Sequence, residues 1–209
     1  MKYTYLLLAL FVSTIINAQE TNYKDNISID IKKVKKAPTL FHTQQNIKVK
    51  GEDLTKIMVK TKIKSKNKED VDVNPFSLLD TVNKIRYRMV EFVGYKSFSV
   101  GVPTYQGKEI LKTELINKRG RPYANIPKYD EKVKDTFEDY EFNDYKNVTC
   151  NVNFGSKKNP ILSGIYYAPI TMNSFVADIF FAIHKFDKAP VFELYYGTEK
   201  VTDIKIKLK

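Results

Sequence analysis

Acidic side chains in the middle of the sequence are the residues whose type and spacing could perform chemistry. Two pairs stand close together there, Glu138 with Asp139 and Glu141 with Asp144. Glycoside hydrolysis uses two carboxyl groups about 5 to 10 Å apart, one of them acting as a general acid. A general acid usually needs burial to raise its pKa, whereas this segment is densely charged. We therefore interpret these carboxylates as a solvated surface and keep a carboxylate-dependent hydrolase as an alternative.

The two histidines and the single cysteine form no recognisable metal or nucleophile motif. His42 and His184 are far apart in the sequence, and a zinc site needs three or four ligands. Cys150 has no histidine near it in sequence and alternates with Val148 and Val152, so its thiol is expected to point into the core as an inert side chain. No phosphate-binding glycine loop or serine elbow occurs. The sequence predicts a non-enzymatic protein with no catalytic residue, no cofactor and no metal.

A row of lysines is the clearest candidate for a binding surface. Lys60, Lys62 and Lys64 alternate with apolar residues in one segment, and Lys205 and Lys207 do so near the end of the chain. If both segments lie in one sheet, they form a basic face that could dock on an anionic polymer, at about 1 kcal/mol or less per lysine. Lysines on edge strands also block unwanted strand pairing. We favour this second, structural interpretation at the level of sequence and keep the basic binding face as its alternative.

The start of the chain has the layout of a secretory signal peptide. Within residues 1–18, Lys2 precedes an apolar run over residues 6–12 that ends in small or uncharged residues. This run is shorter than the ~20 apolar residues that span a bilayer, and no other segment approaches that length. We expect residues 19–209 to be secreted or periplasmic, with no transmembrane segment after removal of the signal.

The net charge of the chain indicates what kind of partner it would bind. The chain has 35 basic and 24 acidic residues, which gives a net charge of +11 at pH 7. Outside the cytoplasm such a charge favours an anionic envelope component over nucleic acid. Its single cysteine excludes an intrachain disulfide, so the fold must rest on its core.

Two-residue alternation predicts an antiparallel β-protein. Apolar and polar residues alternate over 27–32, 57–64 and 204–208, and other segments are rich in β-branched and aromatic residues. Asn74 and Pro75 interrupt one such run, and proline has no N–H to donate, so we expect a corner between strands there. Short strands separated by turns indicate an immunoglobulin-like β-sandwich formed by one domain.

The composition changes over residues 105–147. This region is charged, and Val133, Phe137 and Tyr140 recur at the spacing of one helix face. It contains too few apolar residues to bury a core of its own. We interpret it as an insertion between sandwich strands that carries a short helix.

Two stretches resemble a known family. The first is Val-Asn-Pro-Phe-Ser-Leu-Leu-Asp at 73–80, with a corner formed by Phe76, Leu78 or Leu79, and Asp80. The second covers the closing strands within 177–208. Together they resemble the telokin-like immunoglobulin-type domains of secreted bacterial proteins of unknown function. The resemblance implies a fold and an extracellular location, and it transfers no catalytic residue. The long insertion departs from the family and puts the strand order in doubt.

The expected role is therefore that of a binding or envelope-associated protein with a protein or anionic envelope component as its partner. Adjacent tyrosines at 166–167 and 195–196 offer a further surface, because neighbouring residues of a strand face opposite ways. We expect one tyrosine of each pair to be exposed, although core filling also explains such residues.

Overall fold

The computed structural model describes residues 21–23, 26–37, 53–66, 69–99, 102–156, 158–171, 174–185 and 191–206. The predicted signal peptide, His42 and Lys207 lie outside these residues. Within them, all regular structure is β-strand except for one 3-10 helix, η1 (Thr136–Asp139). The prediction of an all-β, mainly antiparallel fold is confirmed.

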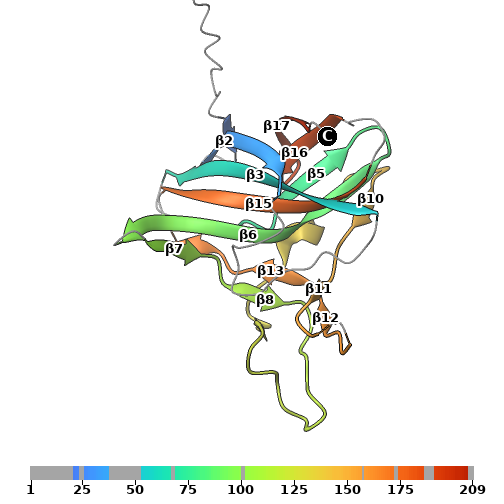
Figure 1. Cartoon of the computed structure of the whole chain (residues 1–209). Coiled ribbons are helices and arrows are strands. Elements are labelled where there is room, and N and C mark those ends of the chain that lie inside the picture. The colour runs from blue at the N-terminus through green and yellow to red at the C-terminus, as the bar shows by residue number, and fades with distance from the viewer. Residues whose placement is uncertain are drawn as a thin grey trace, which may run out of the picture.

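One large twisted sheet organises the molecule (Figure 1). Its strands follow the order β1-β2-β3-β15-β6-β5-β16-β17, and β7 and β10 also pair with β6. All of these pairs are antiparallel except β10 with β6. The strands are β1 (Thr21–Tyr23), β2 (Ile27–Lys36), β3 (Leu54–Ser65), β5 (Phe76–Asp80), β6 (Ile85–Ser99), β7 (Val102–Gln106), β10 (Lys146–Val148), β15 (Ser174–His184), β16 (Val191–Tyr196) and β17 (Glu199–Lys205).

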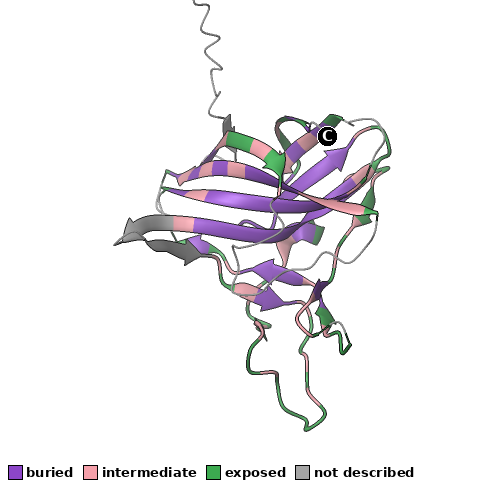
Figure 2. Ribbon diagram, in the orientation of Figure 1, coloured by how far each residue is buried: buried purple, intermediate pink, exposed green. Residues whose placement is uncertain are grey.

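Strand β6 joins the two halves of this sheet. Its first residues pair with β5, whereas its later residues pair with β15 and β7. The sheet curls so far that β17 approaches β2, which produces a sandwich- or barrel-like arrangement. Its inner face holds the core, seen as the buried stretches of the strands in Figure 2. Fully buried core residues on these strands include Ile57, Val59, Leu78, Ile179, Phe181, Phe192 and Leu194.

Small sheets close one end of the core. Leu111, Ile165 and Tyr167 belong to the same buried cluster as the large sheet. They lie on β8 (Glu109–Leu111) and β13 (Ile165–Tyr167), which pair together, and β9 (Lys128–Tyr129) adds to β8. Two further pairs are β4 (Asp70–Val71) with β14 (Ile170–Thr171), and β11 (Val152–Asn153) with β12 (Leu162–Ser163). The chain between β8 and β9 extends away from the sheets as a long loop (Figure 1).

The predicted corner at Asn74 and Pro75 is present between β4 and β5. Asn74 is buried, and its Nδ2 donates to the Tyr167 carbonyl and to Asp72 Oδ1, both at 2.8 Å. The Tyr167 N–H in turn donates to Asn74 Oδ1 at 2.8 Å. The side chain therefore replaces a backbone partner at the point where the proline ends the pairing.

Residues 130–145, called here the covering segment, differ from the expected exposed helix. Their only helical turn is η1, which Asp135 caps by accepting from the Phe137 N–H, and the chain is extended again at Tyr140. Phe137 is fully buried, whereas Val133 and Tyr140 are only partly buried. The segment lies on the outer face of β5 and β6, where its carbonyl groups bind side chains of the sheet. Arg86 and Tyr166 of the sheets bond to four of its carbonyl groups, and turn bonds within the segment pair others.

Candidate binding sites

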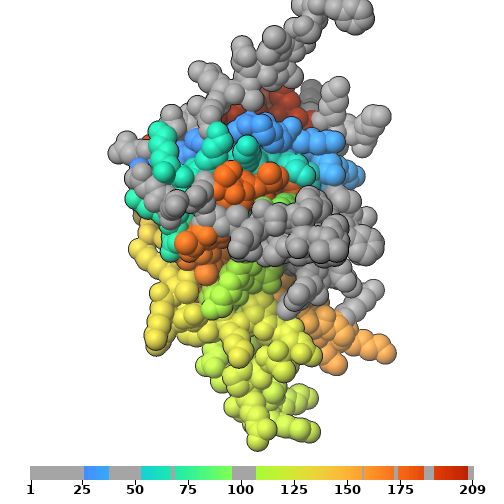
Figure 3. Space-filling model, turned by 90° about the vertical axis from the view of Figure 1, so that its left-hand side faces the viewer, coloured from blue at the N-terminus to red at the C-terminus, as the bar shows by residue number. Residues whose placement is uncertain are grey.

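Five lysines on the outer face of β2 and β3 are called here the lysine face; Lys56, on the same face of β3, forms an ion pair with Glu91 and is not included. The five are Lys33, Lys35, Lys60, Lys62 and Lys64. Lys33 and Lys35 are exposed, and the three on β3 are partly exposed. In the space-filling view of Figure 3, β2 (blue) and β3 (cyan) occupy the upper part of one side of the molecule, above β15 (orange).

Edge protection does not explain the lysines of β3. This strand pairs with β2 on one side and with β15 on the other, so Lys60, Lys62 and Lys64 stand in the interior of the sheet. Lys205 lies on β17, at the end of the strand order, where edge protection remains a sufficient reason. Four strands separate β17 from β3 in that order, so the predicted row from Lys60 to Lys205 is not formed across paired strands.

Lys33 and Lys35 were not predicted as part of a basic face. A bulge between Ile31 and Lys33 shifts the register of β2, which places Lys33 opposite Lys60. Simple alternation from Ile27 onward would have turned these two lysines the other way. The dense Lys-Lys-Val-Lys-Lys run at 32–36 was the available signal.

Carboxylates on neighbouring strands adjoin the lysine face. Asp178 on β15 is 4 % exposed, and its Oδ1 lies 4.0 Å from Lys60 Nζ. Tyr95 donates its hydroxyl to Asp178 Oδ2 at 2.7 Å. On β2, Asp30 stands opposite Lys62 and forms an ion pair with Lys32. The face thus combines cations with acceptor oxygens.

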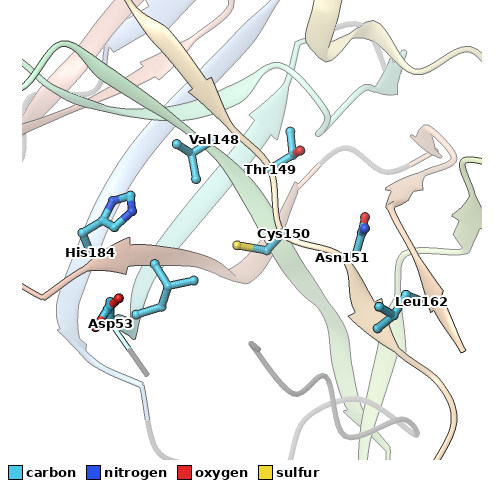
Figure 4. A pocket seen from close by; sticks show the side chains of 8 residues that line it. Asp53, Val148, Thr149, Cys150, Asn151, Leu162 and His184 are labelled. Carbon is cyan, nitrogen blue, oxygen red and sulfur yellow. The ribbon is translucent and has the colours of Figure 1, made fainter. Parts of the chain in front are cut away.

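A cavity of about 410 Å³ lies beside the end of β15 (Figure 4). His184 and Cys150 both contribute to its wall, although they are distant in sequence. Its lining residues are Asp53, Leu54, Val148, Thr149, Cys150, Asn151, Leu162 and His184. The strand predicted over 148–154 is broken between β10 and β11, which leaves Cys150 half-buried at the cavity and not in the main core. The thiol nevertheless packs against a second, smaller cluster of buried residues, so its expected contact with apolar core side chains is present although the strand is not continuous. This cluster consists of Met58, Val90, Val93, Phe180 and Ala182.

A hydrogen bond joins Tyr87 and His184 beside this cavity. The Tyr87 hydroxyl lies 2.7 Å from His184 Nδ1, and burial raises the pKa of Tyr87 to about 12. The phenol therefore keeps its proton at neutral pH, and its oxygen also accepts from the His184 backbone N–H at 3.4 Å. Burial also raises the pKa of the Cys150 thiol. A raised pKa keeps the thiol protonated and opposes a thiolate nucleophile at this site.

The carboxylates that were considered for hydrolysis form no buried site. Glu138, Asp139, Glu141 and Asp144 are all exposed, which is not the burial that raises a general acid's pKa. Across the described parts of the chain, no group of three or more His, Cys, Asp or Glu side chains is arranged to hold a metal ion.

The tyrosine pairs differ from each other. Tyr166 and Tyr167 are both buried, because Tyr166 packs under the covering segment and donates to the carbonyls of Asp130 and Val133. The expectation of one exposed member is wrong for this pair. In the second pair Tyr196 is buried and Tyr195 is partly exposed.

Fold and surface define this chain as an all-β, mainly antiparallel protein with a basic outer face. Comparison with known proteins found no matching family model, no matching curated protein and no matching solved structure. No helix in the described residues has the length and apolar character needed to cross a membrane.

Proposed function

We propose that this chain is a non-enzymatic, secreted or periplasmic protein that binds an anionic polymer of the cell envelope through the lysine face. The observation that carries the proposal is the direct opposition of Lys33 and Lys60 on two paired strands. Like charges directly opposite each other destabilise a sheet. Lys60 cannot serve as an edge guard, since β3 is paired on both sides. A polyanion laid across β2 and β3 would relieve this repulsion.

The expected interaction is electrostatic and moderate. A lysine close to an anionic surface contributes about 1 kcal/mol, and screening reduces this contribution as salt rises. Within the described residues, no carboxylate forms an ion pair with Lys33, Lys35 or Lys62. These three ammonium groups therefore supply the attraction in the proposed complex.

The location and the finer fold belong to the same proposal. Residues 1–18 support export by their composition. An immunoglobulin-like relationship is supported by the corner before β5 and by the closing hairpin of β16 and β17. It is an analogy of fold and carries no activity with it.

Charge reversal tests the proposed function. Binding of a fluorescent polyuronate to the purified protein is measured over increasing salt, with neutral dextran as the reference ligand. The variant Lys33→Glu/Lys62→Glu is expected to bind at least about tenfold more weakly. Its matched control is Lys118→Glu/Arg119→Glu, which changes the net charge equally at exposed positions of the long loop between β8 and β9. Equal losses in both variants would show a general charge effect and reject the lysine face as the site.

A further inference from the structure

Two buried carboxylate oxygens at the lysine face have no hydrogen-bond donor. They are Asp30 Oδ1 and Asp178 Oδ1. Only four buried side-chain atoms in the described residues lack a partner, and these two lie on neighbours of the same strand, β3. A buried acceptor without a donor is costly, so a pair of them beside one surface calls for an explanation.

Strand pairing places the two carboxylates on either side of Lys60 and Lys62 of β3. Asp30 on β2 is opposite Lys62, and Asp178 on β15 is opposite Lys60. Neighbouring strands are about 4.8 Å apart, so the two acids flank β3 across roughly 10 Å. Ammonium groups and carboxylate oxygens therefore alternate over roughly 10 Å. A ligand that contacts all of them must be longer than a single small ion, such as a chain of several polar rings.

The ion pair of Lys60 with Asp178 leaves Asp178 Oδ1 without a hydrogen bond, so this oxygen can still accept one. A separation of 4.0 Å between Lys60 Nζ and Asp178 Oδ1 exceeds hydrogen-bonding distance. The Lys60 side chain is 41 % exposed, so its ammonium group can move without disturbing the core. A ligand hydroxyl placed there would accept from Lys60 and donate to Asp178, which satisfies both groups at once.

We infer that the ligand of the lysine face is an acidic glycan. This inference rests on the proposed function and names its ligand class. The acidic groups of such a polymer pair with the lysines, and its hydroxyls supply the donors that Asp30 and Asp178 lack. A polyphosphate has negative charge but offers few donors at neutral pH, and the two carboxylates would repel it.

Opposite responses of two polyanions test this inference. The variant Asp178→Leu keeps the approximate size of the side chain and removes both the charge and the acceptor. Binding of the variant to polyuronate is expected to weaken about fivefold or more, because hydroxyl bonds to a carboxylate are lost. Binding to inorganic polyphosphate is expected to tighten, since one negative charge has been removed. Tighter or unchanged polyuronate binding would overturn the inference.

A second variant and the charge-reversal variant distinguish failure of the glycan assignment from failure of the proposed function. Asp178→Leu also removes the acceptor of the Tyr95 hydroxyl, so Asp30→Leu provides the same test at an independent position. If Lys33→Glu/Lys62→Glu weakens both polyanions while both Asp→Leu variants tighten both, only the glycan assignment fails. If the charge reversal weakens neither, the proposed function itself fails.

Discussion

Arg88 of β6 and Asp135 of the covering segment form a two-bond ion pair, with Nη2 to Oδ1 at 2.7 Å and Nη1 to Oδ2 at 2.9 Å. The neighbouring Arg86 donates to the carbonyls of Tyr140 at 2.6 Å and Phe137 at 3.0 Å. The Phe137 ring lies against both guanidinium groups, 3.8 Å from Arg86 Cζ and 4.8 Å from Arg88 Cζ. Two buried arginines thus fasten a charged segment to the outside of the sheet.

Removing the charge of Asp135 should destabilise the protein strongly. Asp135→Asn removes the carboxylate that bonds directly to the buried Arg88 and leaves only the more distant Glu138, at 4.0 Å, as a counter-ion. Loss of one partner of a buried ion pair costs about 3 kcal/mol or more. The free energy of unfolding in urea at pH 7 measures this cost. The matched control is Asp139→Asn, whose ion pair with Lys134 is exposed and should contribute below about 1 kcal/mol. Equal effects of the two substitutions would contradict the anchoring role of Arg88.

The same pair predicts an acid limit. Burial alone would raise the pKa of Asp135, but the hydrogen bonds and charge of Arg88, with Lys112, lower it below its ordinary value. Stability from this group is therefore present above the unfolded pKa of about 4 and is lost as pH falls through the lower folded pKa. The difference between the wild-type protein and Asp135→Asn should shrink over that acidic range.

Glu109 predicts a pH dependence of opposite sign. Burial, with a smaller effect of the Glu91 charge, raises the pKa of Glu109 from 4.5 to about 7. The folded state then holds a proton that the unfolded state releases, so stability should fall as pH rises from 4.5 to about 7, by at most about 3 kcal/mol. Glu109→Gln should be more stable than the wild-type protein at pH 8 and similar to it at pH 4. Thermal unfolding at both pH values measures this, and parallel pH profiles would count against it.

Cys150 should react slowly with thiol reagents. Because burial raises the pKa of the thiol, its reaction with a disulfide reagent at pH 7.5 should be about tenfold slower than in the unfolded chain. His184→Gln should change the rate less than about twofold, since the imidazole is bonded to Tyr87. A fast reaction that depends on His184 would instead indicate an activated nucleophile in the cavity.

The region of residues 105–147 contains a dispensable part and an essential part. At the tip of its long loop, Asn117 and Arg121 bond to each other, and Ile116 bridges only to Pro122. Replacing residues 117–121 by two glycines should change the unfolding free energy by less than about 1 kcal/mol. Replacing residues 130–145 by a Gly-Ser linker should abolish cooperative unfolding, because Arg86 and Arg88 lose their partners. Circular dichroism during urea unfolding distinguishes the two outcomes.

Sequence patterns predicted the parts of the fold that local chemistry determines. Ile57, Val59 and Ile63 are buried as their alternation with lysines requires, and Asn74 with Pro75 forms the corner. Asp80, which the family resemblance placed in a corner, ends β5, and its carboxylate accepts from the backbone N–H groups of Val82 and Asn83. The alternation and the bonds of Asp80 depend on neighbours within a few residues, whereas the corner also uses Tyr167, 93 residues away.

Features that depend on distant partners were not predictable in the same way. Arg86 and Arg88 alternate with Ile85 and Tyr87, a pattern that usually turns charged side chains to solvent, yet both arginines are buried. Their partners lie about fifty residues later, and no local pattern links the two segments. The acidic and aromatic composition near Phe137 is the only sequence signal that the covering segment packs on these arginines.

The position of β15 in the sheet constrains the order in which the fold can form. This strand separates β3 from β6, and its Ala177 pairs with Thr61, 116 residues earlier in the chain. During synthesis, which starts at the N-terminus, β3 and β6 are made long before β15. Each of them therefore keeps one side unpaired until almost the whole sequence is available. Such delayed closure makes folding slow and exposes strand edges to aggregation.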